Sequence, residues 1–379
     1  MKIVVAVDSF KGSMSSLEAG YAVKNGIEKV FENAKVIVTP IADGGEGTVD
    51  ALVSGLNGKL KQVMVTNPLG EKISASYGIV KGNTAVIEMS AAAGITLIPT
   101  NKLNPMKTTT YGVGEIIKDA ILSNCNNFII GIGGSATNDG GVGMLQALGF
   151  EFSDDLGNQV PFGAEGLSKI VKISDKNALP QLKNCTFNIA CDVSNPLCGE
   201  KGCSRIFSPQ KGAKEEDIEV MDNYLLSYAN LTKLLYPSSN KDLPGAGAAG
   251  GLGFAFSSYL NGKLTSGIQL ILNAINFDGI VKDADLVITG EGRMDSQTAM
   301  GKTPIGIANL AKKHGATVIA FTGSATYDSN VLNKLGIDAI FPIVRGASSL
   351  EDAMNTKNAM KNMEATVEQV MNLIKTLKV

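Results

Sequence analysis

Lys2-Ile-Val-Val-Ala-Val-Asp8 is a β-branched run of the kind found in buried strands, and it ends in an acidic turn. Ser15-Ser-Leu-Glu18 follows with the spacing of a capping box and predicts a helix that continues to about Phe31. A second β-branched run covers residues 35–41, and another helix is expected from Thr48. Strands that alternate with helices in this way predict a parallel α/β sheet.

The middle of the chain has a different pattern. Residues 60–98 contain short apolar runs separated by Asn67-Pro-Leu-Gly70 and Lys81-Gly-Asn83, which is typical of antiparallel hairpins. Alternating strands and helices then return. The later strands are expected at residues 128–132, 186–190, 285–289, 317–321 and 339–344.

This order predicts a nested arrangement of two α/β domains. Residues 1–64 plus 283–379 are expected to form a discontinuous domain with a flavodoxin- or Rossmann-like parallel sheet. Residues 65–282 are expected to form a large inserted α/β domain. Open α/β sheets bind ligands near the carboxyl ends of their strands, so we expect the active site in the cleft between the domains.

Composition excludes several classes of function. The 379 residues carry 34 basic and 36 acidic side chains, a net charge of −2, which does not suit a general nucleic-acid binder. No run of 18 apolar residues is present, and the first apolar run is too short for a signal peptide. We therefore expect a cytoplasmic protein with neither a membrane nor a nucleic-acid partner; a homodimer stays open.

Histidine and cysteine chemistry is also restricted. His314 is the only histidine, and its position before Gly315 is typical of a helix C-terminus. A nucleophile activated by histidine is therefore excluded, and acid–base chemistry falls to carboxylates or lysine. The five cysteines form no C-x-x-C pair, so we expect reduced, structural thiols.

Three glycine-rich segments carry acidic and polar residues, at 131–143, 244–253 and 289–298, and we expect each of them to be a loop. Glycine lets backbone amides approach an anion closely, and nearby carboxylates suit an anion that carries magnesium. The combination indicates an enzyme that handles a nucleotide phosphate and a small substrate.

Two of the motifs resemble nucleotide-binding signatures incompletely. Gly245-Ala-Gly-Ala-Ala-Gly250 has the dinucleotide spacing, but the residues before it are typical of a loop rather than a strand. A nicotinamide-dependent hydroxy-acid dehydrogenase stays open as an alternative, as does a non-catalytic sugar-acid binding protein. Gly301-Lys-Thr303 fails the Walker A spacing, yet Lys302 lies at the start of a predicted helix, where anions bind readily.

Polar turns follow the first two strands of the predicted first sheet. Lys11, in the turn after residue 8, could bind a carboxylate or phosphate, and Asp43 or Glu46 could bind hydroxyl groups or a metal. Turn formation alone is the alternative explanation for such residues. Arg293 and Arg345, two of only three arginines, follow strands and suggest anion recognition.

Six segments in their order along the chain resemble the glycerate kinase type-1 family. They are Asp8-Ser-Phe-Lys-Gly-Ser13, Ala42-Asp-Gly-Gly-Glu-Gly-Thr48, Gly133-Gly-Ser-Ala-Thr-Asn-Asp-Gly-Gly141, Asp192-Val-Ser-Asn-Pro-Leu197, Gly245-Ala-Gly-Ala-Ala-Gly-Gly-Leu-Gly253 and Thr289-Gly-Glu-Gly-Arg-Met-Asp-Ser-Gln-Thr298. The resemblance covers essentially the whole chain. It implies ATP-dependent phosphorylation of D-glycerate with Mg²⁺, and a nested two-domain fold. We expect 2-phosphoglycerate as the product, with 3-phosphoglycerate as the alternative.

Physical reasoning then assigns roles to residues. The expected nucleotide-binding residues are Gly133, Gly134, Ser135, Asn138, Gly245, Gly247, Gly250 and Lys302. The expected substrate-binding residues are Ser9, Lys11, Asp43, Gly44, Glu46 and Arg345. The catalytic candidates are Lys11, Arg293, Asp192 and Asp295. Asp192 and Asp295 each follow a strand, and we expect one to accept the substrate proton and the other to bind Mg²⁺.

Overall fold

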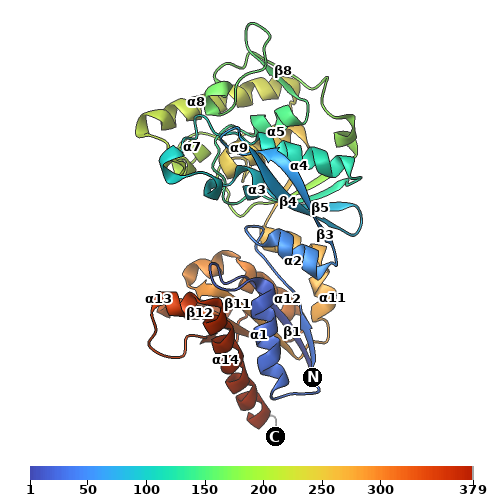
Figure 1. The fold of residues 1–379 in the computed structure, drawn as a ribbon, viewed down its shortest axis with the longest axis vertical. Coiled ribbons are helices and arrows are strands. Elements are labelled where there is room, and N and C mark those ends of the chain that lie inside the picture. Colours follow the sequence, from blue (N-terminus) through green and yellow to red (C-terminus); the bar gives the residue numbers. More distant parts are fainter. Residues whose placement is uncertain (378–379) are drawn as a thin grey trace. The chain divides into compact units, whose positions relative to one another are not determined.

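The computed structural model describes residues 1–377 and divides into two compact units. Of the described residues, the first unit contains 1–43, 50–56 and 268–377, and the second contains 44–49 and 57–267. In Figure 1 the first unit combines the blue start of the chain with its orange and red end. Each unit has its own sheet and its own core.

The sheet of the first unit is entirely parallel, with the strand order β13-β12-β11-β1-β2. Its strands are β1 (Lys2–Val7), β2 (Lys35–Val38), β11 (Leu286–Met294), β12 (Thr317–Ala325) and β13 (Ala339–Pro342). The strand β1, which lies between β11 and β2, is buried on both faces, since its residues alternate between two covered sides. Such double burial explains why its sequence is continuously apolar rather than alternating.

Two long helices cover one face of this sheet. Ala19 and Val23 of α1 (Ser16–Glu28) and Val367 of α14 (Thr356–Leu377) share a core with Val5 of β1. The capping box predicted for α1 is present, with Ser15 and Glu18 each hydrogen bonding the other's backbone. The remaining helical segments of this part of the chain are α2 (Thr48–Gly55), α10 (Gly267–Ala274), α11 (Phe277–Val281), η5 (Ser296–Met300), α12 (Thr303–Lys313), η6 (Tyr327–Leu335) and α13 (Leu350–Met354).

The second unit contains a mixed sheet with the order β10-β9-β6-β5-β4-β3. Its strands are β3 (Lys59–Thr66), β4 (Lys72–Val80), β5 (Thr84–Glu88), β6 (Asn127–Gly131), β9 (Thr186–Ala190) and β10 (Lys263–Thr265). The hairpins predicted for residues 60–98 are confirmed, because β4 is antiparallel to both β3 and β5. The pairs from β5 through β10 are parallel.

Helices and a small two-stranded sheet complete this unit. They are α3 (Ser90–Ala93), η1 (Ile95–Leu97), η2 (Thr100–Lys102), α4 (Tyr111–Leu122), α5 (Val142–Ala147), β7 (Glu151–Ser153), α6 (Ala164–Leu167), β8 (Lys172–Ser174), η3 (Pro180–Asn184), α7 (Cys203–Phe207), η4 (Pro209–Lys211), α8 (Glu215–Leu235) and α9 (Ala248–Tyr259). Their core is rich in aromatic side chains, and Phe128 stacks on Phe187 across the neighbouring strands β6 and β9.

The predicted fold class is confirmed: the first two strands and the last three form one parallel sheet, and an α/β segment is inserted between them. The divisions between the two units lie at 43/44, 49/50, 56/57 and 267/268, whereas the expected domain boundaries were 64/65 and 282/283. As domain boundaries they stay a prediction, and so does an active site between the domains.

Two of the three glycine-rich segments are more regular than we predicted. β11 continues to Met294, so most of the 289–298 segment is a strand rather than a loop. At Gly290 a Cβ atom would lie 2.0 Å from the carbonyl oxygen of Phe321 in β12. Glycine is therefore required there by the close approach of the neighbouring strand, not by a turn.

The other segment, 244–253, enters helix α9 through a kink. Ala249, Gly250 and Gly251 all have left-handed backbone angles inside it. The kink packs on the 131–143 segment: the amide of Gly140 donates to the carbonyl of Gly250 at 2.9 Å. A Cβ atom on Gly250 would lie 2.0 Å from the carbonyl oxygen of Thr137. The two glycine-rich segments of the second unit therefore support each other.

This packing predicts unequal effects of two glycine substitutions in the second unit. Gly157 has φ +83° and open space around it, whereas Gly250 has φ +67° and faces backbone. Gly157→Ala should cost about 1 kcal/mol, from backbone strain alone. Gly250→Ala should cost about 1–3 kcal/mol more, because of the clash. Chemical denaturation of both variants tests this, and equal losses would contradict the packing argument.

Candidate functional site

The carboxyl ends of β1 and β11 meet where the first sheet changes direction. The chain passes from β1 outward to β2 through α1, and from β11 outward to β12 through α12, on the other side. Open α/β sheets bind their ligands at such a reversal, beyond the carboxyl ends of the strands. Asp8 directly follows β1, and Glu291 lies near the end of β11, so both acidic residues occupy this position.

Asp8 is a buried carboxyl group held by two hydrogen bonds. The Ser9 amide donates to its Oδ1 at 2.6 Å, and the Thr303 hydroxyl donates to its Oδ2 at 2.8 Å. Burial raises the pKa of Asp8 to about 7, and the negative charges of Asp43 and Glu291 act in the same direction. The strand ends thus concentrate negative charge in a poorly solvated place.

Glu291 and Asp295 belong to a network in the same region. The Thr298 hydroxyl donates to Oε1 of Glu291 at 2.6 Å, and burial raises the pKa of Glu291 although Lys302 opposes that shift. Asp295 caps η5 by accepting a hydrogen bond from the amide of Gln297 at 2.9 Å. Arg293 lies 3.4 Å from Asp295, Nε to Oδ2, and is largely exposed.

The cations predicted for this unit lie at its surface. Lys11 is exposed in the turn closed by Phe10 and Met14, and its amide lies close to Gly292 of β11. Lys302 is the N-cap of α12, and the hydroxyl of the next residue, Thr303, binds Asp8. Arg345 is exposed after β13.

The second unit presents the 131–143 segment beyond β6. Gly133 and Gly134 are exposed, Ser135 is nearly buried, and Asn138 and Asp139 are fully enclosed. The Asn138 side chain donates to the Ser204 hydroxyl at 2.9 Å, which is a structural contact. Whether Asn138 also takes part in nucleotide binding stays a prediction.

Asp139 organises the second half of this segment. Its carboxylate accepts hydrogen bonds from the amide and hydroxyl of Thr110, both at 2.8 Å, and from the amides of Gly141 and Gly143. Burial raises the pKa of Asp139, and these four donors oppose that shift. Asp139 therefore fixes the backbone conformation of residues 139–143 through these hydrogen bonds.

Lys211 is a site residue that sequence reasoning missed. It is 2% exposed at the end of η4, and its Nζ donates to the Ser135 hydroxyl at 2.6 Å and the Thr137 carbonyl at 2.7 Å. Burial lowers its pKa to about 8. In the sequence, Lys211 is one lysine among many, and no local pattern marks it as buried.

The remaining predicted residues of the second unit lie around the end of β9. Asp192 is exposed, and its Oδ1 accepts a hydrogen bond from the Gly267 amide at 3.0 Å. Gly44 packs against Ala190, and Glu46 is exposed nearby in the chain. Gly245 and Gly247 are buried: a Cβ atom on Gly247 would lie 2.2 Å from the Pro196 carbonyl oxygen.

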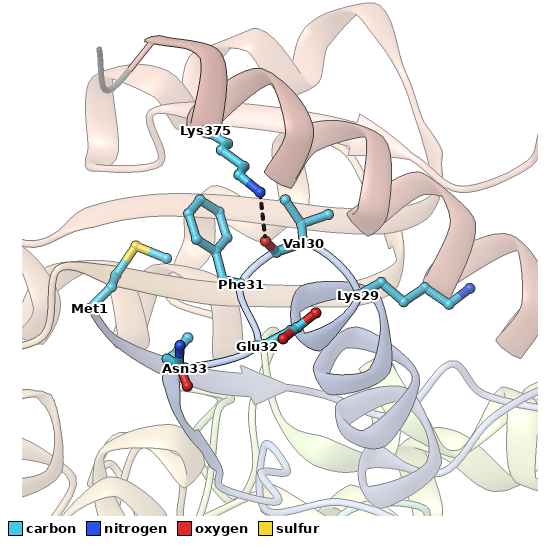
Figure 2. Close-up of a pocket in the computed structure, with 8 residues that line it drawn as sticks. Met1, Lys29, Val30, Phe31, Glu32, Asn33 and Lys375 are labelled. Carbon is cyan, nitrogen blue, oxygen red and sulfur yellow. Dashed lines mark hydrogen bonds between the residues drawn. The ribbon is translucent and has the colours of Figure 1, made fainter.

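A pocket of about 490 Å³ lies at the opposite, amino-terminal end of β1 (Figure 2). Its two lysines already have partners: Lys29 pairs with Glu364 and Glu368, and Lys375 donates to the Val30 carbonyl. No strand end of the first sheet contributes a carboxylate to it. It is lined by Met1, Lys29, Val30, Phe31, Glu32, Asn33, Ala34 and Lys375.

The chain is similar to known proteins over nearly its whole length. A model of the glycerate kinase family matches residues 3–375. The chain belongs to the glycerate kinase family. It is 48% identical to a glycerate kinase of Bacillus subtilis (strain 168), over 100% of this chain and 99% of that protein. It is 47% identical to a glycerate 2-kinase of Escherichia coli (strain K12), over 97% and 98%.

The fold of this glycerate kinase family member also matches a solved structure. A crystal structure assigned as glycerate kinase 2 from Salmonella typhimurium LT2 aligns with a TM-score of 0.92 and 43% identity, and the match covers 100% of this chain and 99% of that one. Within residues 1–377, no helix has both the length and the apolar composition needed to cross a membrane.

Asp8 predicts a pH-dependent stability in the absence of ligand. Folding raises the pKa of Asp8 from 3.8 to about 7. Asp8 therefore lowers the free energy of unfolding as the pH rises from about 4 to 7, because burial opposes its negative charge. Asp8→Asn should therefore increase the free energy of unfolding near pH 8 by roughly 2 kcal/mol or more. This gain should shrink as the pH falls toward 4, because the native carboxyl group is then neutral.

Thermal or chemical unfolding of wild type and Asp8→Asn across this pH range, without metal or substrate, tests the prediction. Asp50→Asn provides the control, because Asp50 is an exposed carboxylate of the same unit, on α2. A pH-independent difference between wild type and Asp8→Asn would contradict the raised pKa.

Proposed function

We propose that this protein transfers the γ-phosphoryl group of ATP to a hydroxyl group of D-glycerate and forms 2-phosphoglycerate. The main support is identity of 43–48% over nearly the whole chain with proteins that are named glycerate kinases. The name of the Escherichia coli relative, glycerate 2-kinase, favours the 2-hydroxyl as acceptor. Formation of 3-phosphoglycerate is the alternative.

The polarity of the first unit suits the substrate. Crowded carboxylates at Asp8, Asp43 and Glu291 disfavour a bare phosphate there and favour hydroxyl groups, which donate to carboxylates. Lys11 and Arg293, both exposed, are candidates for the glycerate carboxylate or the transferring phosphoryl group. Ser9 and Arg345 stay substrate-binding predictions.

The second unit suits the nucleotide phosphates. The exposed Gly133 and Gly134 present backbone amides, which can donate hydrogen bonds to phosphate oxygens. Gly250 supports this segment by packing on Thr137, whereas Gly245 and Gly247 stay nucleotide-binding predictions. The dinucleotide alternative is disfavoured because residues 236–247 lie in turns and irregular chain, with no strand before the motif.

Magnesium fits this chain only as an ion shared with a nucleotide. Within residues 1–377, no three Asp, Glu, His or Cys side chains form a metal-binding group. Mg²⁺ in phosphotransferases is usually held by one or two carboxylates together with substrate phosphates, where it neutralises charge. Asp192 is exposed and Asp295 is half-buried, so either carboxylate is accessible enough to be a candidate for this role.

The assay of choice measures ADP release with D-glycerate, ATP and Mg²⁺. We expect ADP formation that depends on glycerate, because transfer requires an acceptor hydroxyl. Enolase added alone should then convert the product to phosphoenolpyruvate, which absorbs in the ultraviolet. If phosphoenolpyruvate appears only after phosphoglycerate mutase is also added, the product is 3-phosphoglycerate.

Two further outcomes would favour the rival functions. Glycerate-dependent reduction of a nicotinamide cofactor without ADP release would support a dehydrogenase. Glycerate binding with neither reaction would support a binding protein. A cytoplasmic location and a homodimer stay predictions beside this proposal.

The two candidate carboxylates should differ in their response to metal. Asp192→Asn and Asp295→Asn should both fold, because asparagine can keep the backbone hydrogen bonds and caps helices about as well as aspartate. Loss of the base should reduce kcat by about 10²–10⁴-fold at any metal concentration. Loss of the metal ligand should be partly restored by excess Mg²⁺ or Mn²⁺.

Circular dichroism and steady-state kinetics over a metal titration distinguish the two roles. Asp154→Asn is the matched control, since Asp154 also accepts backbone amides but lies in an exposed turn outside the glycine-rich segments. Near-wild-type kcat in both Asp192→Asn and Asp295→Asn would move the search for base and metal ligand to Asp43, Glu46, Asp139 and Glu291.

A further inference from the structure

A buried lysine lies beneath the most exposed part of the 131–143 segment. Lys211 donates to the Ser135 hydroxyl and the Thr137 carbonyl, and within residues 1–377 it forms no ion pair with a carboxylate. A buried cation without an ionic partner is costly, so its retention calls for an explanation. The proposed function assigns no role to Lys211.

The hydrogen bond from Lys211 determines what Ser135 can do. Because Nζ of Lys211 carries only donors, the Ser135 oxygen must act as acceptor in this bond. The hydroxyl proton of Ser135 is therefore left to donate elsewhere, and it has no acceptor among the described residues. The positive charge behind the oxygen also makes that proton a better donor.

Backbone donors surround the same hydroxyl group. The amides of Gly133, Gly134 and Ser135 donate to no acceptor in the described part of the chain, although the neighbouring Ala136 amide binds Ala93 at 2.9 Å. Gly133 and Gly134 are exposed, so a ligand can reach these amides. Consecutive free amides, a polarised hydroxyl and a buried cation together match the requirements of an oxyanion.

We infer that residues 133–135 bind an oxyanion and that Lys211 is the positioning residue that orients the Ser135 hydroxyl toward it and balances its charge from below. This inference rests on the proposed function and deepens it, since the oxyanion is then a nucleotide phosphate. The carboxylate of glycerate has the same chemistry, and the experiment separates the two sources.

The surroundings of Lys211 make its charge sensitive to mildly alkaline pH. Its pKa is lowered to about 8 by burial, against the smaller raising effects of Cys203 on α7 and of Asp139. Burial raises the pKa of the Cys203 thiol to about 12, so this thiol stays neutral near pH 8. Asp139 already has four hydrogen-bond donors of its own. Lys211 is thus the group near Ser135 that changes charge in this range.

The test compares Lys211→Met with wild type by steady-state kinetics between about pH 6.5 and 9. Methionine has similar length but no charge. We expect the KM for ATP to rise about tenfold in Lys211→Met near pH 7, with the KM for glycerate within about twofold of wild type. The wild-type KM for ATP should rise above pH 8, and this rise should be absent in Lys211→Met.

Ser135→Ala provides a second variant in case Lys211→Met does not fold. It should raise the same KM, and the double variant should be no worse than the more impaired single variant, because both act through one hydroxyl. Lys214→Met is the matched control, since Lys214 is three residues away but exposed, and it should behave as wild type.

Each outcome bears on the inference. A selective rise in the KM for glycerate would retain the oxyanion site and assign it to the substrate carboxylate. Unchanged KM values for both substrates, or a loss of thermal stability and kcat without a pH-dependent change in KM, would overturn it, because a structural role would produce that pattern.

Binding without turnover separates this inference from the proposed function. Calorimetric titration with pyrophosphate, ADP and D-glycerate should show weaker binding of pyrophosphate and ADP to both Lys211→Met and Ser135→Ala. If wild type shows this binding but no glycerate-dependent ADP release, the function proposal fails and the oxyanion site stands. If turnover is normal but neither variant loses affinity for any of the three, the oxyanion site is wrong.

Discussion

The parallel pairing of β1 with β11 is the constraint on which the first unit depends. Ile3 to Val7 align with Leu286 to Gly290, so the first strand of the chain pairs with this neighbour only after the whole second unit has been traversed. Entropy of loop closure grows slowly with length, so such a pairing costs little more than a shorter one. Both edges of β1 are then hydrogen bonded, one to β11 and one to β2, and the carboxyl end of β1 lies beside β11.

That pairing also creates the electrostatics of the candidate site. Asp8 accepts a hydrogen bond from Thr303 only because α12 follows β11, which lies beside β1. The same alignment places Glu291 close enough to raise the pKa of Asp8. The connections that follow β1 and β11 lead to opposite sides of the sheet, so neither connection crosses the ends of these two strands. The polar groups at the strand ends therefore stay available for a ligand.

Features that depend on local pattern were predictable, and those that depend on distant backbone were not. The capping box at Ser15 and the strand at 186–190 follow from residue types within a few positions. Gly290 was placed in a loop because its need for glycine comes from Phe321 on the neighbouring strand. Lys211 was missed for the same reason, since burial of a lysine depends on packing that no local pattern contains.

Two buried charges divide the 131–143 segment into parts with different tasks. Asp139 uses the amides of Gly141 and Gly143, together with Thr110, so those donors are committed to the fold and cannot serve a ligand. Lys211 instead occupies acceptors, the Ser135 hydroxyl and the Thr137 carbonyl, and thereby leaves donors free. The buried carboxylate of Asp139 holds the second half of the segment by accepting hydrogen bonds from its donors. The buried cation of Lys211 leaves the donors of the first half free to bind a ligand. The sign of the buried charge, rather than the number of glycines, then determines which half of such a segment can receive a phosphate.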